Sequence, residues 1–312
     1  MRHKHFIALL IYALSTPTLA IFYFENIPSA KTVEESKLFF SERKNQLINY
    51  YASKELGKKF DLLNHRSFSQ PAVARAYLGI DGDKISKILL KKSFKPFGKV
   101  GTNFKFIPFL CERKGDYDFA LIHLIQLAYL HEKNNILTQP AYKKLLFEIL
   151  IAKGDKHYQR FNLGICGRYK DTENHILMTE TSRYLTNDLL KQYYQDKNMV
   201  LPKEYDNEQN GFNAWIIDHL KELKKNFFDE YNSKPYQSYA LIPIANLAGF
   251  SKNNQVRKMA QEILDHQTKI FSVQSINGRR LVPFRRQIVY TQEESLIPGD
   301  GEIARHAFLT GQ

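Results

Sequence analysis

The feature that most constrains the fold is a succession of helical patterns with no sustained strand alternation before residue 275. Apolar side chains that recur every three to four positions predict amphipathic helices, and polar segments with Gly or Pro predict the loops between them. No fixed sequence period is present, so a true solenoid repeat is not expected. The predicted helices lie at residues 33–54, 72–78, 81–92, 117–132, 140–152, 171–190, 211–231, 235–250 and 254–271.

These patterns predict an all-α fold of helical hairpins in one domain over residues 21–275. The remaining residues, 276–312, change in character and predict a short irregular or β segment. Ile276-Asn277-Gly278 is a turn signal, and residues 281–290 have the composition of an extended strand.

The stretch 171–190 places an Asn-His pair, Asn174 and His175, in the first turn of a predicted helix. Asp171 or Thr172 can cap this helix. Polar side chains at the end of a helix are a common place for a site. The simpler interpretation is an amphipathic helix in which the Asn and His only complete its terminus. Five residues at helical spacing are predicted to face inward: Leu177, Thr181, Tyr184, Leu185 and Leu189. A second, more polar stripe on the same helix consists of His175, Thr179 and Arg183.

The charge of the chain and its N-terminus limit the class of partner. Lys and Arg outnumber Asp and Glu by 45 to 32, which favours an anionic partner. Residues 1–20 have the order of a secretory signal peptide: basic Arg2 and Lys4, an apolar run, and Thr18-Leu19-Ala20. Export predicts a periplasmic or secreted protein and argues against nucleic acid as the partner. An uncleaved segment would be the sole contact with a membrane.

Redox and metal chemistry are not indicated by the cysteine and histidine spacing. Cys111 and Cys166 can form one disulfide in an oxidising compartment, or they can be two small buried residues. The sequence contains no CxxC or HExxH motif and no paired-histidine spacing, so we expect neither a metal site nor another cofactor.

A second informative stretch, residues 230–241, gathers three tyrosines at the junction of two predicted helices. Tyr231, Tyr236 and Tyr239 lie there with Asn232, and Tyr236 and Tyr239 are spaced to share a face. Either the rings pack around the junction, or one phenol points into a cleft.

Together these stretches resemble the alginate and heparin-type polysaccharide lyases. An Asn-His pair at a helix start is followed about sixty residues later by P-Y-x-x-Y-A-L, and the resemblance covers about residues 115–275. It implies an α/α toroid, here an incomplete barrel of helical hairpins, with the Asn and His beside the sugar carboxylate and a Tyr in proton transfer. The same toroid also hosts glycoside hydrolases. The matching residues are Asn174, His175, Pro235, Tyr236, Tyr239, Ala240 and Leu241.

Cleavage of a uronate polymer by β-elimination requires three roles. Asn174 and an arginine can stabilise the developing enolate. His175 or a tyrosinate can remove the C5 proton, and Tyr236 can protonate the departing oxygen, with Tyr239 or Tyr231 as substitutes. We therefore expect an exported protein that binds and cleaves an acidic polysaccharide.

The other candidate substrate-binding residues are basic or carboxylate side chains. The segment Gly278–Arg286 carries four arginines that can clamp carboxylates or sulfates, or can form a solvated loop. A hydrolase would need two carboxylates, and Glu173 with Glu230 or Asp229 is the best pair. A non-catalytic module that binds glycan or cell envelope is a further alternative. The substrate-binding candidates are Glu173, Arg183, Tyr231, Asn232, Arg279, Arg280, Arg285 and Arg286.

Overall fold

The structure is a computed structural model that describes residues 31–57, 66–92, 94, 100–101, 117–151, 171–231, 233, 236–276 and 279–280. This part of the chain is mostly helical, as the sequence predicts. In order, its helices are α3 (Val33–Ser53), α4 (Arg66–Leu78), α5 (Gly82–Leu90), α6 (Asp118–Asn134), α7 (Gln139–Lys144), the π-helical turn η3 (Leu145–Leu150), α8 (Glu173–Asp196), the 3-10 turn η4 (Lys203–Tyr205), α9 (Phe212–Asn226), α10 (Gln237–Phe250) and α11 (Asn254–Val273).

Helix α6 lies in the core, and its sequence explains why. Its apolar residues are not confined to one stripe, and every residue from Ala120 to His131 is buried. A helix that is hydrophobic all round must be covered on all sides. Helices α4, α8 and α10 pack against it and provide this cover.

Helices α6, α8 and α10 run in the same direction. At their starts, His175 of α8 contacts Asp118 of α6. Farther along, the hydroxyl of Tyr129 donates to the carbonyl of Leu185 at 3.1 Å, and its ring stacks on Phe250 with 4.5 Å between centroids. Because contacts join both the early and the late parts of the three helices, their N-terminal ends meet at one end of the molecule.

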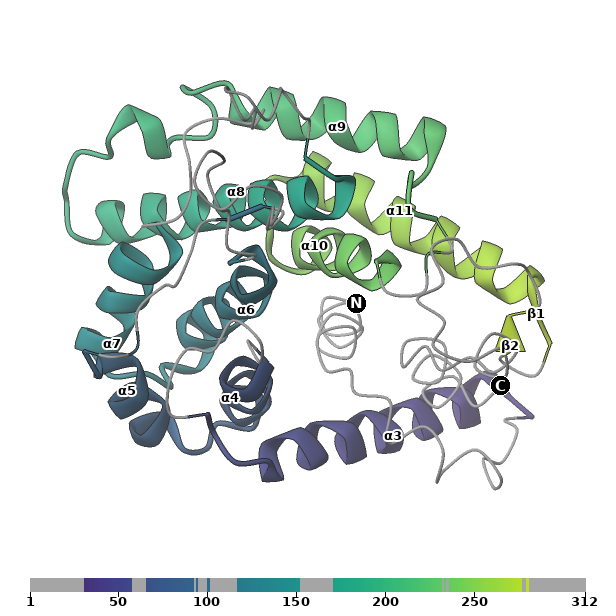
Figure 1. The fold of residues 1–312 in the computed structure, drawn as a ribbon, viewed down its shortest axis with the longest axis horizontal. Coiled ribbons are helices and arrows are strands. Elements are labelled where there is room, and N and C mark those ends of the chain that lie inside the picture. The colour runs from purple at the N-terminus through teal and green to yellow at the C-terminus, as the bar shows by residue number, and fades with distance from the viewer. Residues whose placement is uncertain are drawn as a thin grey trace, which may run out of the picture.

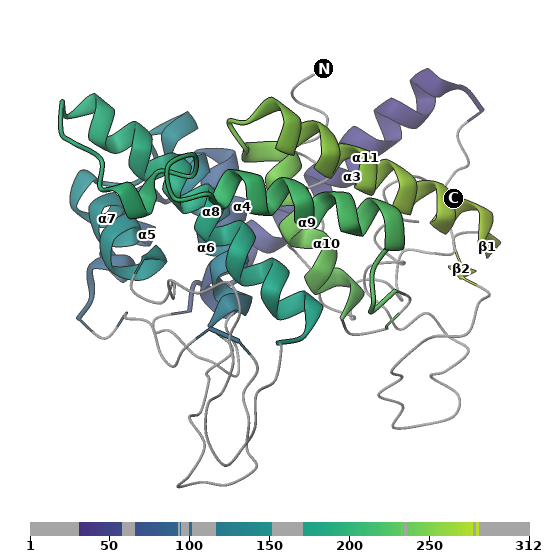
Figure 2. The same ribbon diagram turned by 90° about the horizontal axis from the view of Figure 1, so that it is seen from above.

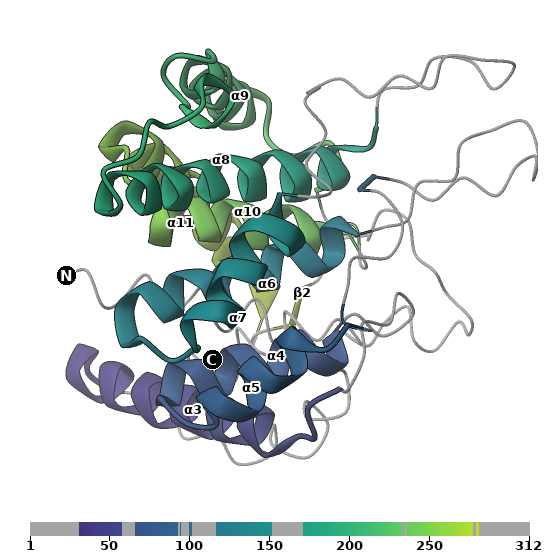
Figure 3. The same ribbon diagram turned by 90° about the vertical axis from the view of Figure 1, so that its left-hand side faces the viewer.

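Helices α9 and α11 form an outer pair. The start of α9 contacts the middle of α8, where the Tyr184 hydroxyl donates to Asn213 at 2.8 Å. The segment after α9 returns to the start of α8, so α9 is antiparallel to α8. Figures 1 and 3 show α6 and α10 toward the middle, with α9 on one outer side and α3 on the opposite one. The outer helix α9 is thus antiparallel to α8, whereas α6, α8 and α10 are parallel to one another.

The two ends of the molecule differ in their elements. Figures 1 and 2 place α5 and α7 at one end and α11 with the strands β1 (Ser275–Ile276) and β2 (Arg279–Arg280) at the other. The strands pair antiparallel, with Ser275 opposite Arg280. The C-terminal segment therefore begins with a short β pairing next to α11.

Some predicted boundaries were wrong. Helix α4 begins at Arg66, before the predicted residue 72, and contains Pro71. The predicted helix 140–152 is α-helical only to Lys144 and continues as η3. Closure of the hairpins into an α/α toroid stays a prediction. The predicted signal peptide, Cys111, Cys166 and residues 281–312 lie outside the described residues. None of the described helices is long and apolar enough to cross a membrane.

Candidate functional site

The common direction of α6, α8 and α10 brings their first turns together, and we call this region the helix-start site. Its members are Asp118 and Phe119 of α6, residues 173–175 of α8, and residues 236–239 at the start of α10. The unpaired amide groups at a helix start carry partial positive charge. Three such starts at one end of the molecule create a region that suits anionic groups.

A buried carboxylate–imidazole pair lies at the centre of this site. The Nδ1 atom of His175 is 2.5 Å from Oδ2 of Asp118, and the other carboxylate oxygen accepts the Gly101 N–H at 2.9 Å. Asp118 is 0% and His175 6% exposed. The pair therefore links α8 to α6 in surroundings where water screens little of their interaction.

Asn174 is the least exposed member of the site on α8, at 1%. Its side-chain oxygen accepts a hydrogen bond from the Thr172 hydroxyl at 2.6 Å. Its amide nitrogen is buried and has no hydrogen-bond acceptor among the residues that the structure describes. Thr172 occupies the N-cap position but makes no capping bond with its side chain, in contrast to the predicted role. A buried donor without an acceptor is rare and indicates a position where a ligand or water supplies one.

Aromatic contacts connect the pair to α10. The Phe119 ring contacts the His175 ring edge to face, with 5.2 Å between centroids, and the Tyr239 ring in the same manner at 4.6 Å. Tyr239 is therefore one ring away from His175. Tyr236 lies at the N-cap of α10, one turn before Tyr239, and is half-buried. The structure thus brings His175 and Tyr239 into one neighbourhood through Phe119, and Asn174 adjoins His175 in the first turn of α8.

Glu173 forms a second, acidic part of the site on another side of α8. Its Oε2 atom accepts the backbone N–H of Asp229 at 2.8 Å, while Oε1 is buried without a hydrogen-bond partner in the described part of the chain. Burial raises the pKa of Glu173 to about 7, and the charges of Asp229 and Glu230 add to this rise. Backbone N–H groups of the same two residues oppose it. Since Glu173 and His175 are two positions apart, they face different sides of the helix.

Two other predicted substrate-binding residues have structural partners away from the helix start. Arg183 pairs with the buried Glu180 at 2.9 Å and lies over the Phe212 ring. It is eight residues beyond His175, about 12 Å along the helix axis.

The Tyr231 hydroxyl bonds to Gln274, at the end of α11. The backbone of Arg279 and Arg280 forms β2. Asn232, Arg285 and Arg286 lie outside the described residues.

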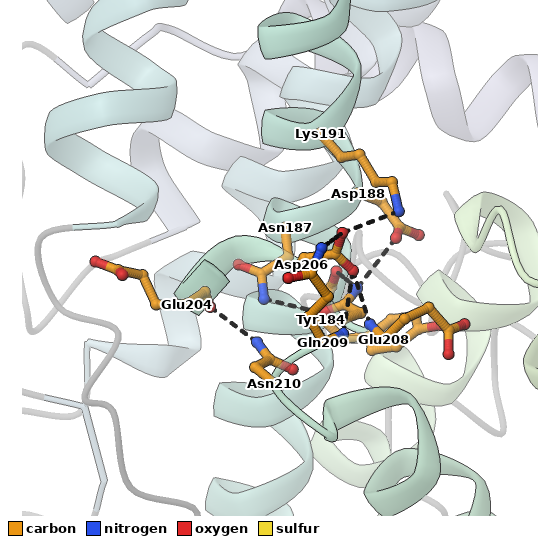
Figure 4. A network of polar contacts seen from close by, with 10 residues as sticks. Tyr184, Asn187, Asp188, Lys191, Glu204, Asp206, Glu208, Gln209 and Asn210 are labelled. Carbon is orange, nitrogen blue, oxygen red and sulfur yellow. Dashed lines mark hydrogen bonds and ion pairs between the residues drawn. The ribbon is translucent and has the colours of Figure 1, made fainter. Parts of the chain in front are cut away.

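The middle of α8 carries a different polar cluster, which we call the α8 network (Figure 4). Asn207 donates to the Tyr184 carbonyl at 3.0 Å and to Asp188 at 3.1 Å, and it accepts from Asn187 at 2.8 Å. Asp206 accepts from Lys191 and from backbone N–H groups of its own turn. The network fastens the segment before α9 onto α8.

Asp118 and Phe119 belong to the site although no sequence motif pointed to them. The available signal was a single carboxylate at the start of an otherwise apolar helix, a position that is buried once the helix is covered. Within the described ranges, no three His, Cys, Asp or Glu side chains come together in a way that could hold a metal ion.

Comparison of the chain with protein-family models, with curated proteins and with solved structures found no match. The assignment of a function therefore rests on the geometry of the helix-start site.

Proposed function

We propose that the protein is an exported carbohydrate-active protein that binds an acidic, uronate-containing polysaccharide and cleaves it by β-elimination at the helix-start site. The observation that carries this proposal is the buried Asp118–His175 pair together with the buried Asn174 amide on α8, which has no acceptor among the described residues. The fold proposed for it is an incomplete α/α toroid, with α6, α8 and α10 as inner helices.

The chemistry follows from the positions of three side chains. The amide of Asn174 donates to the uronate carboxylate and favours the enolate that forms when C5 loses its proton. His175 accepts that proton, and the C5–H electrons form the double bond between C4 and C5. The bond from C4 to the leaving oxygen breaks, and the oxygen takes a proton from a tyrosine. Tyr239 suits this role better than Tyr236 because it shares Phe119 as a neighbour with His175.

A second candidate function is glycoside hydrolysis, which the environment of Glu173 favours. A general acid must hold a proton near neutral pH, and burial raises the pKa of Glu173 to about 7. Glu230 or Asp229 would then be the second carboxylate that hydrolysis requires. In this alternative, His175 has no direct part in the reaction.

One assay separates these functions. The purified protein is incubated with alginate, heparin-type and pectic polymers, and both ultraviolet absorbance of unsaturated uronate and new reducing ends are followed. Elimination produces both signals, whereas hydrolysis produces reducing ends alone. Binding without either signal would indicate a non-catalytic glycan-binding module.

Two tyrosine substitutions, one at Tyr239 and a control at Tyr205, test the proposed proton donor. Tyr239→Phe keeps the ring contact with Phe119 and removes the proton donor, so we expect a fall in turnover of about 10²-fold or more. Tyr205→Phe, in η4 beyond the far end of α8, removes the hydroxyl of another half-buried tyrosine and should leave turnover unchanged. Equal rates for both variants would contradict the role of Tyr239.

A further inference from the structure

We propose that Asp118 is a positioning residue that holds the proton of neutral His175 on Nδ1, so that Nε2 is the nitrogen that accepts the substrate proton. This inference rests on the proposed function and specifies which atom of the helix-start site acts as the base. The sequence patterns did not assign a role to Asp118, because its contact with His175 joins two helices that are far apart in the sequence.

The two contacts of the carboxylate determine its role. An ionised carboxylate only accepts hydrogen bonds. Oδ1 accepts the Gly101 N–H at 2.9 Å, and Oδ2 lies 2.5 Å from Nδ1 of His175. Nδ1 must therefore carry a proton to satisfy Oδ2, which places the lone pair of the neutral ring on Nε2.

The location of Asp118 strengthens this effect. It is the first residue of α6, where the helix start favours a negative charge, and its side chain is fully buried. Its orientation is fixed by the backbone of Gly101, and Phe119 packs against the His175 ring. When Nε2 accepts the substrate proton, the resulting imidazolium faces a carboxylate that is already in place.

The same geometry predicts what an amide would do at this position. In Asp118→Asn, the Gly101 N–H still requires an oxygen, so the amide NH₂ is turned toward Nδ1 of His175. Nδ1 must then accept a hydrogen bond, and the ring proton moves to Nε2. The variant keeps the shape of the wild-type side chain but presents an N–H to the substrate where a base is required.

The first test observes the tautomer directly and needs no substrate. In protein with ¹⁵N-labelled histidine, the His175 signals are identified by their loss in His175→Gln. We expect Nδ1–H in the wild type and Nε2–H in Asp118→Asn. Asp188→Asn is the matched control, since it changes a half-buried, hydrogen-bonded carboxylate of the α8 network and should leave the His175 tautomer unaltered. Nε2–H in the wild type, or the same tautomer in wild type and Asp118→Asn, would overturn the inference.

The second test uses the elimination assay. We expect Asp118→Asn to lower kcat by about 10²–10⁴-fold with little change in KM, because binding is retained and the base is lost. Asp188→Asn should keep the wild-type kcat. A wild-type kcat in Asp118→Asn would overturn this inference but would leave the proposed function standing. If the wild-type protein cleaves no polymer, the proposed function fails, and the tautomer measurement still decides whether Asp118 positions His175.

Discussion

The start of α8 and the α8 network both contain polar side chains removed from water, but they differ in whether those side chains have hydrogen-bond partners. In the α8 network, Asn207 forms three hydrogen bonds, and Asp188 accepts from Asn207 and from the Lys252 N–H. At the helix start, the Asn174 nitrogen and Oε1 of Glu173 are buried without hydrogen-bond partners among the described residues.

This difference separates polar groups that stabilise the fold from polar groups that are available to a ligand. A buried donor or acceptor without a partner costs about 1–3 kcal/mol of folding free energy. A satisfied network stabilises the native state, whereas an unsatisfied group is tolerated where a bound molecule completes it. The comparison predicts that substitutions at the helix start change function more than stability, and that substitutions in the α8 network do the reverse.

The largest expected effect is the loss of the base at the helix start. We expect His175→Ala to reduce the elimination rate by about 10²–10⁴-fold, because it removes the base that Asp118 orients to accept the C5 proton. Turnover is measured from unsaturated product at saturating polymer. His266→Ala removes an exposed histidine of α11 and serves as the control. If His175→Ala keeps the turnover of the wild type, the helix start is not the part of α8 that carries the function.

The next effect concerns stability in the α8 network. We expect Asn207→Leu to lower the free energy of unfolding by about 2–4 kcal/mol, because it removes three hydrogen bonds, to Asn187, Asp188 and the Tyr184 carbonyl. Urea denaturation measures the change, and affinity for an acidic oligosaccharide should be unaltered in the folded protein. A variant as stable as the wild type would show that this network is dispensable for the fold.

The sequence predicted the elements of the fold better than the partners within the site. Periodic apolar residues located most helices within a few positions, and the Asn-His pair was correctly placed in the first turn of α8. The partner of His175 lies 57 positions away and becomes a neighbour only when α6 packs on α8. Arg183 shows that a partner close in the sequence can also be overlooked. Its side chain was predicted to bind substrate, but it forms an ion pair with Glu180, three residues away.

The pH dependence of stability gives a smaller effect at the helix start. The pKa of Glu173 is raised to about 7 by burial, so between pH 4.5 and 7 the folded state holds a proton that the unfolded state releases. Stability from this group is present below about pH 4.5 and is lost as pH rises through 7. Glu173→Gln should therefore be more stable than the wild type by about 1–3 kcal/mol at pH 8, after allowance for partial exposure.

Asp188, a half-buried carboxylate of the α8 network, loses its contribution to stability in a different pH range, which allows the two regions to be separated. Burial raises the pKa of Asp188 to about 6, so its contribution is lost at lower pH than that of Glu173. Denaturation at a series of pH values should show that Glu173→Gln removes the decline between pH 6 and 7 and leaves most of the decline below pH 6. The same profile in variant and wild type would contradict the raised pKa of Glu173.

The smallest change in stability is expected for Asn174→Leu, which is the matched partner of Asn207→Leu. Leucine has a volume similar to that of asparagine. The substitution removes a buried donor that has no acceptor in the described part of the chain. The Thr172 hydroxyl loses its acceptor but is only half-buried and can turn to water. The free energy of unfolding should therefore change by less than about 1 kcal/mol.

Affinity of Asn174→Leu for the acidic oligosaccharide should fall by about tenfold or more, because a donor to its carboxylate is lost. A loss of stability as large as that of Asn207→Leu, with affinity retained, would mean that Asn174 belongs to the fold and that the two regions of α8 do not differ.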